Sequence, residues 1–311
     1  MKLPLDTFGN LHRNQHPKYG KAPHKPILLL AVLDEIERGR AKSDLITLTP
    51  ELVAAFRAYW RTLVLAKSWI ERIANPFRFM VQEGFWTLVK NGVPVSTRSL
   101  GDNPTINQLT SVVDGAVLAP DLWELLQDHA AIDTLRAFLL NRYFDKEMAG
   151  IQPYIPNNPL DYEVERLKAE AQSKFRAGVV RETADETGYY VRHSLFPKVI
   201  KDLYRHSCAV CSLAVDVDGG GEIVDAAHIM PFNRFHNDDP RNGVALCKNH
   251  HWGFDAGWYT FSDAYTIVAS PRLRSAPSYI RAEVRILLPA QIEYAPALEA
   301  IAWHRAHIYK R

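Results

Sequence analysis

The three cysteines of this 311-residue chain all fall between positions 208 and 247, and they constrain its fold more than any other feature. Cys208 and Cys211 form a C-x2-C pair, and Cys247 with His250 forms a C-x2-H pair. Thiolate and imidazole donors at these spacings are typical of a closed tetrahedral Zn²⁺ site. An odd number of cysteines, behind an N-terminus without the apolar segment of a secretion signal, argues against a disulfide framework. We therefore predict that these four residues hold a structural zinc ion.

A second set of polar residues lies in the same stretch. The spacing predicts a strand from Glu222 to His228 and a helix that carries His251 and Asp255. Because His251 and Asp255 are four residues apart, both project from one helix face toward one cation. A strand histidine that faces this cation can deprotonate water, and Asn242 can orient the histidine through its side-chain amide. An imidazole and a carboxylate leave coordination positions open for water and phosphate, as a catalytic metal site requires.

Short blocks around these residues, in this order, resemble the HNH (ββα-metal) endonuclease family. The blocks are AAHI, NGVALC and HHWGFDAG, preceded by FPKVIKDLYRHSCAVC and followed by AIAWHRAHIYK. The resemblance covers residues 190–311 and implies that His228 is the general base that activates water for attack on a phosphodiester. It further implies that Asn242 positions this histidine and that His251 and Asp255 hold a catalytic Mg²⁺ or Mn²⁺.

One position departs from the family pattern. Many HNH enzymes have a metal-ligating Asp or His directly before the general base, and here Ala227 stands in that place. Asp225 lies two residues earlier and points the same way on a strand, but about 6–7 Å further along. Asp225 can join the catalytic metal only if the strand is bent; otherwise water or a substrate oxygen completes the shell.

The first half of the chain predicts a mainly helical domain with a small sheet. An apolar run opens a helix whose first turn holds Pro26 and which stops at Gly39. Thr49 followed by proline predicts the start of the next helix. Gly84–Val89 reads as a strand, and Leu122–Phe144 as one amphipathic helix.

The domain boundaries follow from length and composition. With 311 residues the chain is about twice the usual size of a single domain. Residues 149–160 are rich in proline and asparagine, which is typical of a linker, and a charged helix is predicted over 162–177. We therefore predict an α+β protein with a recognition domain over 1–148, a linker and connecting helix over 149–189, and a nuclease domain over 190–311.

The segment between Asp6 and Asp34 has no acidic residue but several basic ones, although the net charge of the whole chain is only +2. Such a locally basic stretch suits a phosphate-contacting surface. The candidates are Arg13, Lys18, Lys21 and Lys25.

Two segments, GKAPHKPILLLAVL and NPFRFMVQEGFWTLV, resemble the sulfur-binding domains of phosphorothioate-dependent restriction endonucleases over residues 10–145. The resemblance implies an apolar pocket of Pro76 with Phe77 or Phe79 that accepts sulfur, and a cationic rim of His24 and Lys25. Two positions depart from the family: Asn75 replaces an aromatic residue, and Phe79 is large where a small residue would leave room.

Together these features predict a metal-dependent endonuclease that cleaves double-stranded DNA and senses phosphorothioate. Two alternatives stay open: a zinc-stabilised DNA-binding protein whose HNH fold no longer cuts, and an HNH nuclease that reads another DNA feature, acts on RNA or serves as a toxin. The sequence has no apolar run of eighteen residues, so we expect a cytoplasmic protein without a membrane span. One active site cuts one strand at a time, which makes a homodimer plausible.

Overall fold

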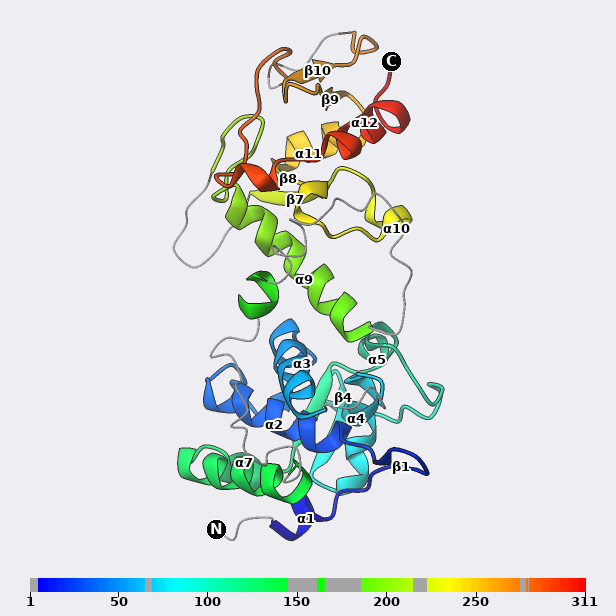
Figure 1. Ribbon diagram of the computed structural model, residues 1–311, viewed down its shortest axis with the longest axis vertical. Coiled ribbons are helices and arrows are strands. Elements are labelled where there is room, and N and C mark those ends of the chain that lie inside the picture. Colours follow the sequence, from blue (N-terminus) through cyan, green and yellow to red (C-terminus); the bar gives the residue numbers. More distant parts are fainter. Residues whose placement is uncertain are drawn as a thin grey trace. The chain divides into compact units, whose positions relative to one another are not determined.

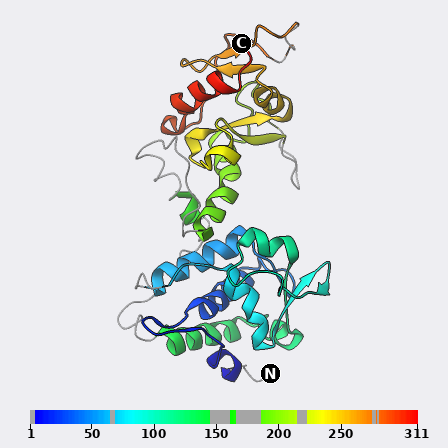
Figure 2. The same cartoon turned by 90° about the vertical axis from the view of Figure 1, so that its right-hand side faces the viewer.

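The computed structural model describes residues 5–64, 69–144, 161–165, 186–214, 223–274, 278 and 280–311. The predicted linker, Glu222 and most of the helix predicted over 162–177 lie outside these residues. The chain divides into two compact units. Among the described residues, positions up to 162 and 186–191 belong to the first unit, and positions 163–165 and those from 192 onward belong to the second. Each unit combines helices with small sheets, so the predicted α+β class is confirmed (Figures 1 and 2).

The first unit is built around α2 (His24–Glu37), whose apolar run from Ile27 to Leu33 is buried all round. Three helices pack on α2: α3 (Pro50–Leu63), α4 (Ala74–Phe79) and α7 (His129–Phe144) (Figure 1). Helix α3 begins where predicted, because the Thr49 side chain accepts a hydrogen bond from the Leu52 amide at 3.1 Å.

The single helix predicted from Leu122 to Phe144 is wrong, because the structure has two helices there. Helix α6 (Pro120–Leu125) ends, and α7 begins again at His129. Asp128 lies between them, and its carboxylate accepts a hydrogen bond from the Ala130 amide at 3.0 Å. This side-chain cap satisfies an amide at the start of α7 and favours a new helix over continuation of the old one.

One antiparallel sheet in the first unit has the order β3 (Leu45–Ile46), β6 (Gly115–Leu118), β4 (Trp86–Lys90) and β5 (Val93–Pro94). The predicted strand begins two residues late, since Gly84 ends the 3-10 turn η1 (Met80–Glu83) at a φ of +82°. The unit also contains α1 (Leu5–Gly9), β1 (Gln15–His16), β2 (Gly20–Lys21) and α5 (Ile106–Val112).

The second unit contains a ββα arrangement. Strand β7 (Val224–His228) pairs antiparallel with β8 (Gly243–Cys247), and α11 (Lys248–Asp255) follows β8 directly. Helix α9 (Glu186–Leu203) packs on β8 so closely that a Cβ at Gly243 would lie 2.3 Å from Ile200 Cδ1. Glycine at position 243 therefore brings the helix against the two strands.

The other elements of this unit are α10 (Phe232–Phe235), η2 (Pro240–Asn242), β9 (Tyr259–Phe261), β10 (Ile267–Ala269), η3 (Ile292–Tyr294) and α12 (Leu298–His307). Among the helices that the structure describes in either unit, none has the length and apolar character needed to cross a membrane.

Candidate active site and metal centre

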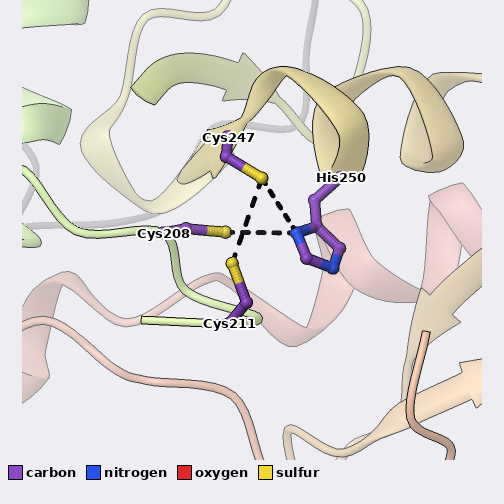
Figure 3. Close-up of side chains that lie close together, drawn as sticks. All are labelled: Cys208, Cys211, Cys247 and His250. Carbon is purple, nitrogen blue, oxygen red and sulfur yellow. Dashed lines mark hydrogen bonds between the residues drawn. The ribbon is translucent and has the colours of Figure 1, made fainter. Parts of the chain in front are cut away.

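The four residues predicted to bind zinc lie together (Figure 3). Their ligand atoms are all within 4.8 Å of one another. His250 Nδ1 is 3.0 Å from Cys247 Sγ and 3.5 Å from Cys208 Sγ, and Cys211 Sγ is 4.0 Å from Cys247 Sγ. A tetrahedral zinc ion needs about 3.8 Å between two sulfurs and about 3.6 Å between sulfur and nitrogen. The donor types and the spacing of their atoms therefore fit a structural zinc ion.

Backbone contacts hold this cluster between the loop after α9 and the start of α11. Cys247 ends β8 and caps α11, which places His250 in the first turn of that helix. In the loop, the Ala209 amide donates to the Ala245 carbonyl on β8 at 2.8 Å, which ties the first cysteine pair to the second. Tyr259 OH supports His250 by donating to its carbonyl at 2.8 Å.

His228, the predicted general base, is the last residue of β7. Its Nε2 lies 3.0 Å from Asp238 Oδ1, and its ring stacks on Phe196 with centroids 3.8 Å apart and planes 7° apart. Within the described part of the chain, no hydrogen bond is formed by the other ring nitrogen, Nδ1. The ring is thus fixed by a carboxylate on one side and an aromatic face on another.

Asp238 was not among the predicted site residues. It is only 8% exposed, and its second carboxylate oxygen lies 3.5 Å from His193 Nδ1 on α9. Burial alone would raise the pKa of Asp238, but the hydrogen bonds with His193 and His228 hold it below its usual value. The sequence offers only the acidic pair before Pro240 as a signal, and the second acid, Asp239, caps η2 by accepting from the Arg241 amide.

Asn242 forms its side-chain hydrogen bonds with the backbone of Met230 and Asn237 and none with the His228 ring in the described part of the chain, so it does not orient the histidine by the predicted direct hydrogen bond. Its side chain is fully buried and donates to the carbonyls of Met230 and Asn237, each at 3.0 Å. Its Oδ1 accepts from the Met230 amide at 2.9 Å. Asn242 therefore fixes the loop that follows His228 and precedes Asp238.

The predicted ligands of a catalytic metal meet at His251. Its Nδ1 lies 3.2 Å from Asp225 Oδ2, and its Nε2 lies 3.5 Å from Asp255 Oδ2. Lys248 Nζ donates to the other Asp225 oxygen at 2.6 Å. Asp225 thus reaches the histidine despite its place two residues before Ala227, but the two carboxylates contact opposite ring nitrogens. The three residues are neighbours that do not converge on one point as the cysteine cluster does.

The first unit contains a cavity of about 650 Å³ lined by five of the eight residues predicted to bind DNA. These are Arg13, His24, Lys25, Pro76 and Phe79. Phe77 is fully buried and packs edge-on against Trp86, so its predicted contact with DNA does not fit its position. Lys18 and Lys21 are exposed and are not among the residues that line the cavity.

The charges at this cavity differ from the predicted cationic rim. Burial lowers the pKa of His24 to about 4, and its Nε2 donates to the Ile70 carbonyl at 2.8 Å, so this histidine is neutral at pH 7. Lys25 is only 6% exposed and forms an ion pair with Glu83. Arg72, which the sequence reasoning missed, lines the cavity together with Arg13.

Polar and aromatic side chains complete the wall. Tyr19 and Trp69 line the cavity, and so do Asn75 and Asn103. Asn75 Nδ2 donates to Asn103 Oδ1 at 2.8 Å, while the buried Asn75 Oδ1 has no partner among the described residues. The cavity therefore offers ring faces and guanidinium groups, and one of its lining residues, Asn75, has a buried oxygen without a partner among the described residues.

Comparison with known proteins identifies the segment that holds the cysteine cluster and the His228 site. Residues 208–262 match the HNH endonuclease family, which confirms the predicted HNH domain and its assignment to a family of nucleases. This match covers less than half of the chain. A search of curated protein sequences gives no match.

Several solved structures are similar to this chain. The modification-dependent TagI restriction endonuclease has 27% identity over 38% of this chain and 39% of its own, with a TM-score of 0.32. The sulfur-binding domain of ScoMcrA complexed with phosphorothioated DNA has 24% identity over 49% of this chain and 93% of its own, with a TM-score of 0.36. The type IV phosphorothioation-dependent restriction endonuclease ScoMcrA has 12% identity over 81% of this chain and 94% of its own, with a TM-score of 0.35. The present chain thus spans well under half of the TagI structure.

Proposed function

We propose that the HNH domain makes this chain a metal-dependent endonuclease that hydrolyses phosphodiester bonds of double-stranded DNA. The observation that carries the proposal is the His228 ring, which is held by Asp238 on one nitrogen and by Phe196 on one face. A base held in this way is preorganised, because its ring already has the orientation in which it accepts a proton.

In the proposed reaction, His228 Nδ1 takes a proton from water as the water oxygen bonds to phosphorus. The bond between phosphorus and the leaving sugar oxygen breaks, that oxygen takes a proton from solvent, and the imidazolium later returns its proton to solvent. Asn242 supports this step indirectly, because it fixes the loop on which the Asp238 carboxylate lies.

His251 and Asp255 are the residues that would hold the catalytic Mg²⁺ or Mn²⁺, with Asp225 as a third. The two carboxylates are donors that suit these ions. When bound, the ion supplies positive charge to the scissile phosphate. Asp225 already pairs with Lys248, so it has to exchange this partner to act as a ligand.

We further propose that the cavity of the first unit selects the DNA, and that the feature it reads is a phosphorothioate. Sulfur is larger and less strongly hydrated than oxygen, so the faces of Pro76, Phe79 and Trp69 would favour it. Arg13 and Arg72 would hold the remaining charged oxygens. The neutral His24 adds a polarizable ring rather than a charge.

A second candidate reads a different modification. The buried Asn75 Oδ1 without a partner is better satisfied by a hydrogen-bond donor than by sulfur. A modified base with an N–H group would provide such a donor and could stack on the rings of Tyr19 or Trp69. This candidate keeps the nuclease activity and changes only the feature that is recognised.

The nuclease is tested with covalently closed plasmid and Mg²⁺ or Mn²⁺, with EDTA as the control. We expect conversion to nicked or linear DNA with a divalent ion and none with EDTA. A gel shift without cleavage under any of these ions would favour the alternative of a zinc-stabilised DNA-binding protein with an inactive HNH fold.

The reader is tested by binding of the full chain, without Mg²⁺ or Mn²⁺, to matched duplexes with and without backbone sulfur. We expect tighter binding to the sulfur-containing duplex. Equal affinity would reject phosphorothioate recognition and leave the base-reading candidate.

Two proposals concern the setting of the reaction. One active site cuts one strand at a time, so we propose a homodimer on DNA, which sedimentation of the protein–DNA complex can test. A DNA substrate requires access to the chromosome or to incoming DNA, so we propose a cytoplasmic location, which cell fractionation can test.

A further inference from the structure

We infer that Asp238 is a positioning residue for the proposed reaction: its carboxylate accepts the Nε2–H of His228 and thereby keeps Nδ1 as the basic nitrogen that faces water. This inference rests on the proposed function, because it assigns the group that prepares the general base. It adds a residue that the HNH resemblance did not assign.

The contact between the two side chains carries the inference. Asp238 Oδ1 lies 3.0 Å from His228 Nε2, and an ionised carboxylate can only accept hydrogen bonds. The histidine must therefore carry its proton on Nε2 when it is neutral. Stacking on Phe196, with ring centroids 3.8 Å apart, favours this plane of the His228 ring.

The protein holds this carboxylate from several directions. His193 Nδ1 lies 3.5 Å from Asp238 Oδ2, the oxygen that does not contact His228. Asn237, directly before Asp238, is 4% exposed, and its carbonyl accepts from Asn242 at 3.0 Å. Asp239, directly after it, caps η2. Asp238 thus lies between two anchored neighbours, which is what a fixed acceptor requires.

The charge of the carboxylate agrees with this role. The hydrogen bonds with His193 and His228 keep the pKa of Asp238 below its usual value despite burial, so the group is ionised at pH 7. Hydrogen bonding to Asp238 also raises the pKa of His193. Asp255 of α11 also interacts with His228 through space, and the two side chains form no hydrogen bond in the described part of the chain.

The test variant is Asp238→Asn, which keeps the size of the side chain and removes its charge. The amide can donate as well as accept, so it no longer selects one tautomer of His228. We expect plasmid cleavage to fall by about 10²–10⁴-fold, the range for loss of correct general-base function. Asp238→Glu should recover part of the rate, because it restores a carboxylate at a slightly different distance.

The second readout is the tautomer itself, which ¹⁵N NMR of histidine-labelled protein reports from the shifts of the two ring nitrogens. The His228 signal is assigned with the His228→Gln variant. We expect the Nε2–H form in the wild type and a mixture or the Nδ1–H form in Asp238→Asn. A purely structural role would leave the tautomer of the folded variant unchanged, and that result would overturn the inference.

His193→Gln is the matched control, because it alters the outer partner of Asp238 and leaves the contact with His228 in place. We expect a much smaller loss of rate and an unchanged tautomer. The possible outcomes distinguish a failure of the proposed nuclease function from a failure of the role assigned to Asp238. A wild type that does not cleave refutes the proposed function, whereas a cleaving wild type with an equally active Asp238→Asn refutes the inference alone.

Discussion

The HNH domain and the cavity of the first unit differ in how strictly chemistry determines their residues. Zinc accepts few donor types, and Cys208, Cys211, Cys247 and His250 supply them at a spacing that the fold must respect. A cavity with mixed polar and aromatic walls can be formed by many combinations of residue types, so no fixed spacing of residues such as Pro76 and Phe79 announces it in a sequence. A sequence can therefore identify the individual residues of a metal site, whereas for a cavity it identifies only the segments of the chain that line it.

Charge separates the two regions in a second way. Around His228, the charge of Asp238 is directed at one defined atom, Nε2. At the cavity, two of the basic residues predicted from the sequence supply no free positive charge. Lys25 pairs with the buried Glu83, and His24 is neutral. Arg72, which has no motif around it, lines the cavity instead.

The largest expected effect is loss of the second unit in Cys247→Ser. A structural zinc ion contributes roughly 10 kcal/mol or more to small zinc domains, and removal of one thiolate forfeits much of this. We expect the bound zinc measured by elemental analysis to fall and cooperative melting of the second unit to disappear. The first unit should keep its own melting transition, which makes it an internal control.

The comparison between the regions breaks down if Cys247→Ser melts like the wild type and the wild type contains no zinc. The cysteine cluster would then be a packing feature of the same kind as the cavity wall. Cys211→Ser, which alters the exposed member of the cluster, should show a similar loss of zinc.

A smaller effect is expected from the proposed ligands of the catalytic ion. Asp255→Asn should leave folding and zinc content unchanged, because its carboxylate is largely exposed. Cleavage should fall, and more Mn²⁺ should be needed for half-maximal rate, since a carboxylate ligand has been lost. Asp225→Asn should shift this metal requirement less, because Lys248 already competes for its carboxylate. A wild-type metal requirement in both variants would remove them from the site.

Variants of the cavity should affect binding rather than cleavage chemistry. Arg72→Ala should weaken binding to sulfur-containing and sulfur-free DNA alike and reduce the salt slope by about one unit. Pro76→Ser should mainly reduce the preference for sulfur, by about three- to tenfold, as expected for burial of roughly one apolar atom. Fluorescence anisotropy over a range of salt concentrations measures both. The reverse pattern would mean that the residues lining the cavity have been given the wrong roles.

The smallest effect is expected from Lys25, despite its place in the basic segment. Because Glu83 neutralises it, the double variant Lys25→Met with Glu83→Gln removes both charges without leaving one buried alone. The salt slope of DNA binding should stay within error of the wild type. A drop of a full unit would show that Lys25 leaves Glu83 to contact phosphate.

The sequence predicted the zinc cluster, the ββα order and the residues around His251, because each depends on donor type and local spacing. It predicted two helices of the first unit from an apolar run and from the Thr49 cap. It missed the contact between His228 and Asp238, since ten residues of loop separate them and no periodicity relates them. It also misplaced Phe77, because one residue of helical rotation decides whether a side chain faces the core or the cavity.

The proposed mechanism depends on His228 as the general base. The most direct test is the initial rate of plasmid cleavage by His228→Ala at saturating Mn²⁺. His307→Ala, which truncates an exposed histidine of the same unit, is the matched control. We predict a loss of about 10²–10⁴-fold for His228→Ala and none for His307→Ala, with unchanged zinc content and melting in both. Cleavage by His228→Ala at the wild-type rate would contradict the assignment of this histidine as the general base.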